Sequence, residues 1–112
     1  MTVYLSDVIS SMELIERYTT KKTYSDFIND LELHDAVIRR LTVIGEATSR
    51  LTRALRNKYP KIQWKAIIGL RNIIIHNYDN VKLEEIWKIV RKDLPKTKKL
   101  IEKIKKDLIK KE

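Results

Sequence analysis

Apolar residues recur at intervals of three and four along nearly the whole chain, and this spacing places them on one face of an α-helix. The first such run predicts a helix from about Ser6 to Tyr18. Its apolar side holds Leu5, Val8, Ile9, Met12 and Ile15. Thr23 and Asp26 then have the spacing of a capping box, which predicts a short helical turn through Phe27 and Ile28.

The longest apolar pattern predicts a helix from about Asp30 to Lys58, with Pro60 ending it. Its apolar or small residues follow a four-three spacing, at Val37, Leu41, Ile44, Thr48, Leu51 and Leu55. Such a pattern is typical of a helix that packs along another helix.

Three more helices are expected in the second half of the chain. One runs from about Gln63 to His76, before the turn-forming segment 77–80. The next runs from about Lys82 to Lys92, and Pro95 would open the last, because a proline fits the first turn of a helix. The inward residues of the helix before Pro95 would be Leu83, Ile86, Trp87 and Val90. We therefore expect an all-α bundle of about five main helices, in one domain spanning residues 1–112.

The composition narrows the possible chemistry. Without cysteine, the chain has no disulfide, thiolate zinc site or cysteine nucleophile, as is usual in the reducing cytoplasm. No run approaches the roughly 20 apolar residues of a membrane span, and the start lacks the basic region of a signal peptide. We expect a soluble, cytoplasmic protein without a membrane partner.

Positive charge is concentrated at the C-terminal end. The net charge is +9, and residues 88–112 carry eleven Lys or Arg against four Asp or Glu, a net charge of +7. A basic helix of this kind attracts nucleic acid, an acidic partner or an anionic membrane surface. A lysine-rich solvated face without a partner explains the pattern equally well.

The predicted helix from Gln63 to His76 is apolar nearly all round. Projected at about 100° per residue, one side carries Trp64, Ile67, Ile68, Ile75 and Tyr78, and Ala66, Leu70, Ile73 and Ile74 cover much of the rest. A helix of this kind is expected to be buried on two sides. In so small a protein, a second subunit is the natural source of the second contact.

Polar residues interrupt this helix in two places. Lys65, Gly69, Asn72 and His76 form one narrow stripe, within a sector of roughly 60°. Arg71 falls on an apolar side, where an unpaired guanidinium would cost several kcal/mol, so it needs an anionic partner or a path to water. Glu46 in the preceding helix is the candidate partner, and a rim position is the alternative.

His76 and Tyr78 also have purely structural explanations. A histidine near the C-terminal end of a helix is favoured by the helix dipole, and Tyr78 taken alone is a buried aromatic with a polar tip. His34 is given no role. The chain has no metal-binding, phosphate-loop or serine-nucleophile motif, so we expect neither a metal nor another cofactor.

One histidine, one arginine and one asparagine can serve metal-free cleavage of RNA, in which the 2′-hydroxyl is the internal nucleophile. His76 would take or give the proton, Arg71 would neutralise the developing phosphate charge, and Asn72 would orient His76 or the phosphate. Because one histidine is too few for separate acid and base roles, a homodimer that joins two such helices would complete the site.

These residues resemble the motif of the HepT-like ribonuclease toxins of the HEPN superfamily: an arginine, four residues, a histidine, one residue and a tyrosine, at Arg71, His76 and Tyr78. Other landmarks of that family appear in the same order: Phe27, Asp35 to Arg39, Ile44 to Ala47, Tyr59-Pro60, Trp64, Gly69-Leu70, Trp87 and Asp93 to Pro95. The resemblance spans nearly the whole chain.

The resemblance implies a homodimeric HEPN ribonuclease that acts on RNA, with tRNA as the first substrate to consider. It also implies a partner, a minimal nucleotidyltransferase antitoxin that transfers AMP to the motif tyrosine, here Tyr78. Bulk and negative charge added beside Arg71 and His76 would repel the phosphate of RNA.

Two other functions fit the same residues. The chain could be a non-catalytic dimeric helical module that binds a nucleotide, nucleic acid or an acidic partner through Arg71 and His76. It could also be a dimeric adaptor whose polar stripe is interface packing. Cleavage of RNA in EDTA separates the ribonuclease from both.

Overall fold

The computed structural model describes the backbone of residues 1–76 and 83–111 and the side chains of residues 1–71 and 83–110. All the regular structure in these ranges is helical: α1 (Thr2–Thr19), α2 (Tyr24–Asn29), α3 (Leu31–Ser49), α4 (Arg53–Asn57), α5 (Trp64–His76), α6 (Leu83–Lys88), the π-helical segment η2 (Ile89–Asp93) and α7 (Leu94–Lys111). The predicted all-α class is confirmed for this part of the chain. The predicted turn at 77–80 and helix start at Lys82 lie outside the described residues.

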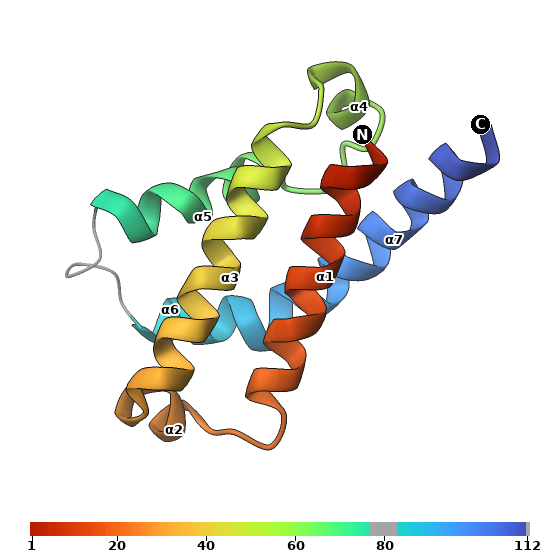
Figure 1. The fold of residues 1–112 in the computed structure, drawn as a ribbon. Helices are drawn as coiled ribbons and strands as arrows, with labels where there is room; N and C mark the ends of the chain where they lie inside the picture. The colour runs from red at the N-terminus through yellow and green to blue at the C-terminus, as the bar shows by residue number, and fades with distance from the viewer. Residues whose placement is uncertain (77–82, 112) are drawn as a thin grey trace.

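Four helices build the body of the molecule. α1 lies along α3, α5 packs on α3, and α7 packs on α1 (Figure 1). The short helices mark the two ends, with α4 at one end and α2 and α6 together at the other. The predicted site positions 71, 72 and 76 therefore lie on α5, which packs against α3.

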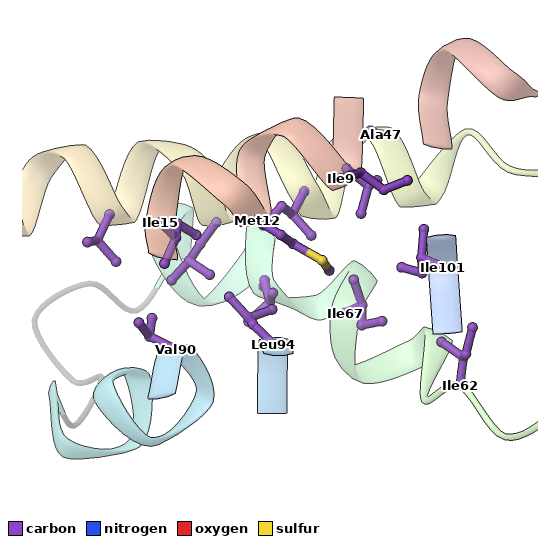
Figure 2. Close-up of a cluster of buried hydrophobic side chains, with 14 of the residues drawn as sticks. Ile9, Met12, Ile15, Ala47, Ile62, Ile67, Val90, Leu94 and Ile101 are labelled. Atoms are coloured by element: carbon purple, nitrogen blue, oxygen red, sulfur yellow. The ribbon is translucent and has the colours of Figure 1, made fainter. Parts of the chain in front are cut away.

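The core confirms the predicted apolar faces of the first two long patterns, whereas of the inward residues predicted before Pro95, Ile86 and Val90 are buried and Leu83 and Trp87 are half-buried. The five predicted positions in α1 are buried, and so are the six in the long pattern after Asp30. Figure 2 shows Met12 and Ile15 of α1 converging with Ile67 of α5 and Leu94 of α7. Burying such side chains removes apolar surface from water, which stabilises the fold by roughly 25 cal/mol per Å².

The prediction of one helix from Asp30 to Lys58 is wrong. α3 ends at Ser49, and the Arg50 N–H bonds back to the Ala47 and Thr48 carbonyls. Thr52 then takes an extended backbone and its hydroxyl accepts a hydrogen bond from the Leu55 N–H at 3.1 Å, which starts α4. A threonine N-cap satisfies a donor that would otherwise lack a partner, so it competes locally with helix continuation.

The prediction that Pro95 opens the last helix is met within one residue, since α7 begins at Leu94, but the break expected between Lys92 and Pro95 is absent. α6 passes into η2 and η2 into α7 with no non-helical residue between them, so Pro95 is the second residue of α7. The Leu94 N–H bonds to the Ile89 carbonyl five residues earlier. Proline has no N–H and its ring clashes with the carbonyl four residues before it, and the wider turn before Pro95 relieves that conflict.

The α2 end of the molecule is fixed by polar and aromatic contacts. The predicted capping box is present: the Thr23 hydroxyl accepts from the Asp26 N–H at 3.1 Å, and the Asp26 carboxylate accepts from the Thr23 N–H at 2.9 Å. The hydrogen bond from the Thr23 backbone lowers the pKa of the Asp26 carboxyl. Phe27 contacts two rings, with its centroid 5.3 Å from the centroids of His34 and Trp87.

The basic helix α7 is anchored rather than free. Leu94, Ile101 and Ile104 are buried, and the Lys98 ammonium lies 3.1 Å from a Glu16 carboxylate oxygen on α1. Its remaining lysines largely face solvent. Across the described ranges, no helix combines the length and apolar character needed to cross a membrane.

The Thr52 cap can be tested by mutation. Thr52→Ala should lower the free energy of unfolding by about 1 kcal/mol, because the Leu55 N–H loses its acceptor. Urea titration followed by circular dichroism measures the change, and Thr52→Ser, which keeps the hydroxyl, should retain most of the stability. Equal stability of the alanine and serine variants would show that the cap does not hold α4.

Candidate active site

Arg71 is the one described side chain of the predicted catalytic set. Its guanidinium donates from Nη1 to the Ser49 hydroxyl at 3.2 Å and lies 3.9 Å from a Glu46 carboxylate oxygen. About a third of the Arg71 side chain (35%) is exposed. The sequence predicted either a pair with Glu46 or a rim position for Arg71. The structure shows both features, because the guanidinium lies near Glu46 and the side chain still reaches solvent.

The contact between Arg71 and Glu46 is not what holds the helices together. Both side chains are more than a third exposed, and the 3.9 Å separation is at the limit of an ion pair. Such surface pairs contribute about 0–1 kcal/mol. The pair matters for geometry instead, because the Glu46 carboxylate lies on α3 and attracts the Arg71 guanidinium to that side of α5.

Ser49 connects the two residues. Its hydroxyl donates to the Glu46 carbonyl at 2.6 Å, which leaves an oxygen lone pair for the Arg71 guanidinium. The order of donors and acceptors is thus set, from Arg71 to Ser49 to the α3 backbone. Sequence reasoning missed Ser49, although its position four residues after Gly45 puts two small residues on one face of α3.

Gly45 sets how closely α3 and α5 approach. A Cβ at this position would lie 2.9 Å from the Arg71 backbone nitrogen and 3.1 Å from the Arg71 Cβ. No ordinary side chain fits there unless the helices move apart. The backbone of Arg71 is therefore seated directly on α3.

The opposite side of α5 is open. A Cβ at Gly69 would meet no atom within 4 Å, and Lys65 and Ala66 are exposed. The buried side is formed by Trp64, Ile67 and Leu70. The prediction that Ile68 belongs to that side is only partly met, since it is half-buried. Within one chain, the described part of α5 is thus buried on one side, and the second contact stays a prediction.

The other predicted site residues lie at the limit of the described region. The α5 backbone continues to His76, so positions 72 and 76 are helical. The side chains of Asn72 and His76, and the whole of Tyr78, lie outside the described residues. Their meeting with Arg71 stays a prediction from the sequence.

Comparison with known proteins gives the family. The family described as "Ribonuclease HepT-like" matches residues 8–104. The chain belongs to the HepT-like ribonuclease family. The matched residues include α3 and α5, so the contacts of Arg71 with Ser49 and Glu46 lie within the region shared with this family.

Individual relatives also have names that include a ribonuclease. A Methanocaldococcus jannaschii protein named "Gamma-glutamylcyclotransferase and putative RNase" is 45% identical over 95% of this chain, which spans about half (48%) of that longer protein. A "Putative RNase" of the same organism is 40% identical, over 88% of this chain and 91% of its own length. A "Probable ribonuclease HepT" of Thermococcus cleftensis is 36% identical, over 92% and 94%. No solved structure gives a significant match.

The two glycines give a matched test of the helix packing. Gly45→Ala should lower the free energy of unfolding by about 1–2 kcal/mol, because the overpacking cost exceeds the gain in helix propensity. Gly69→Ala should raise it by up to about 1 kcal/mol, because the new methyl group meets open space. Chemical denaturation of both variants measures the difference, and equal effects would contradict the close approach at Gly45.

Proposed function

We propose that this HepT-like chain is a metal-independent endoribonuclease and the toxin of a toxin–antitoxin pair, with tRNA as its substrate. The observation that carries the proposal is the placement of Arg71. Its guanidinium contacts Ser49 and Glu46, about a third of its side chain (35%) stays open to solvent, and its helix also carries Asn72 and His76. A cation seated in this way can receive a phosphate without moving far.

The reaction uses the 2′-hydroxyl of RNA as the nucleophile. The 2′-oxygen bonds to the adjacent phosphorus while the bond from phosphorus to the 5′-oxygen breaks, which gives a 2′,3′-cyclic phosphate and a 5′-hydroxyl. His76 accepts the proton of the 2′-hydroxyl, and the partner subunit's His76 donates one to the departing oxygen. Arg71 neutralises the additional negative charge on the phosphate oxygens, and Asn72 orients the histidine or the phosphate.

A homodimer is part of this proposal, since one histidine cannot serve as acid and base at once. Its support is Ala66, an apolar position on α5 that the rest of the described chain leaves exposed. Each subunit would be one domain over residues 1–112, which is supported by the hydrophobic core that α1, α3, α5 and α7 share. The cysteine-free sequence fits the reducing cytoplasm, where tRNA is found.

Control by a partner completes the proposal. A minimal nucleotidyltransferase antitoxin would transfer AMP from ATP to the Tyr78 hydroxyl, with release of pyrophosphate. The phosphodiester adds negative charge and bulk two residues after His76. Arg71 would then be neutralised by the modification instead of by the substrate.

Cleavage of RNA in EDTA tests the activity. Wild-type protein should cut tRNA without a divalent metal, and His76→Ala should lower the rate by at least about 100-fold, the usual contribution of a general acid or base. An oligonucleotide with a 2′-deoxy group at the cut position should stay intact.

The same samples supply the control. Sedimentation and circular dichroism should show an unchanged oligomeric state and helix content for His76→Ala. Unchanged cleavage in this variant would sink the assignment of His76. Ligand binding with no turnover by the wild-type protein would favour the non-catalytic binding module.

The tyrosine modification has its own test. After incubation with the cognate transferase and ATP, intact-mass spectrometry should show additions of the mass of AMP on the wild-type chain and none on Tyr78→Phe. Tyr59→Phe is a suitable control, because Tyr59 is a half-buried tyrosine on the loop before α5, hydrogen-bonded to Asp107. Addition to Tyr78→Phe at the wild-type level would refute the placement.

A further inference from the structure

We propose that the groove between α4 and α5 binds the sugar–phosphate backbone of RNA and leads it to the active site; this rests on the proposed ribonuclease function. The groove has a volume of about 580 Å³. It is lined by Arg53, Arg56, Asn57, Trp64, Lys65, Ile68 and Gly69. Three of these residues are cations, and none is a carboxylate.

The charge of this groove distinguishes it from two others in the described part of the chain. The groove between α1 and α3 is lined by two carboxylates, Asp7 and Glu46, beside its arginines. The groove between α5 and α7 is mainly apolar and includes Asp93. Of these three grooves, the α4–α5 groove alone joins several cations to an uncharged wall, which is the arrangement that a polyanion requires.

The three cations are not used to hold the fold together. Within the described residues, no ion pair involves Arg53, Arg56 or Lys65, and the Nε of Arg56 is buried without a hydrogen-bond partner. Arg53 is also the first residue of α4, where the helix dipole disfavours a cation. A phosphate group that contacts the exposed Arg53 and Lys65 side chains would neutralise this cluster of cations.

The groove is built into the fold by Trp64. Its indole N–H donates to the Arg56 carbonyl at 2.9 Å and to the Tyr59 carbonyl at 3.1 Å, which ties the end of α4 to the start of α5. Because Trp64 is buried in this role, its ring is not free to stack on a base. The groove is therefore suited to the RNA backbone, and binding there should depend little on sequence.

Gly69 opens the groove along α5. A glycine inside a helix costs about 1 kcal/mol relative to alanine, and no neighbour within the described chain requires one here. Its absent side chain lets a backbone approach the helix closely. Positions 72 and 76 follow Gly69 at three and seven residues, so the same side of α5 continues to these two positions of the proposed site, the second about 10 Å further along the axis.

A second copy of the chain is a poor occupant. In a symmetric dimer, the same groove on each subunit would face its own copy and bring like charges together. An acidic protein would fit the charge. RNA is favoured because the open side of α5 connects the cations with the residues that would cleave it.

The experiment compares three pairs of charge-neutralising variants of the whole chain. The groove pair is Arg53→Gln with Lys65→Gln, both exposed residues. The matched control is Arg17→Gln with Lys22→Gln, two exposed cations, one in the last turn of α1 and one in the segment that follows it. The basic helix α7 is the alternative RNA-binding surface, and it is tested with Lys99→Gln and Lys106→Gln, both exposed. The probe is a fluorescein-labelled single-stranded RNA of mixed sequence with 2′-O-methyl groups throughout, so that it cannot be cleaved.

Fluorescence anisotropy at several KCl concentrations gives the dissociation constant and its salt dependence. The groove pair should weaken binding by about 25-fold at 0.1 M salt and lower the log–log salt slope by about 1.4, the expectation for two lost single-strand phosphate contacts. The matched control and the α7 pair should each change the dissociation constant less than about threefold. A groove pair that binds like the matched control, or an equal loss in the α7 pair, overturns the proposal.

A parallel cleavage assay on unmodified RNA separates the two proposals. If the groove pair cleaves RNA as fast as the wild type at sub-saturating protein concentration, the groove proposal is overturned and the ribonuclease proposal is unaffected. Groove-dependent binding of the methylated RNA without any wild-type cleavage overturns the ribonuclease and supports RNA binding in the groove.

Discussion

The packing of α3 against α5 at Gly45 is the constraint on which the rest of the site depends. Because a Cβ there would lie 2.9 Å from the Arg71 nitrogen, the two helices meet backbone to backbone. This contact brings the Arg71 guanidinium within reach of Ser49 and Glu46 on α3. It also turns the opposite side of α5, with Lys65 and Gly69, away from the core and toward the α4–α5 groove.

Much of the fold could be predicted from the apolar pattern, because burial follows the helical period wherever a helix is long. The predicted apolar faces of α1 and α3 are buried almost without exception. The errors occur where local chemistry competes with that period. Thr52 interrupts the long pattern by capping a new helix, yet Leu51 and Leu55 on either side of it remain buried. Near Pro95 the chain stays helical by widening a turn, which periodicity cannot reveal.

The candidate site was predictable in part. Burying an unpaired charge is costly, so the sequence predicted an acidic neighbour for Arg71 and offered Glu46 in the preceding helix as the candidate. The spacing of Ser49 from Gly45 did not reveal this role, since Ser49 lies 22 residues from Arg71 and the link exists only once α3 and α5 are packed. The same holds for the groove, whose cations come from two helices joined by Trp64. Contacts between distant residues depend on tertiary packing, and a single sequence gives no direct measure of it.

The two tryptophans occupy different environments, and this makes the protein its own optical reporter. Trp64 is buried beside the α4–α5 groove with its indole N–H bonded to two carbonyls, whereas Trp87 is half-buried, stacked on Phe27 and covered by the Arg91 guanidinium at 5.5 Å. Their emission therefore reports on two regions, the α4–α5 junction and the α2–α6 end. A molecule that enters the groove would perturb the first indole and leave the second unchanged, so single-tryptophan variants would locate it without any attached dye.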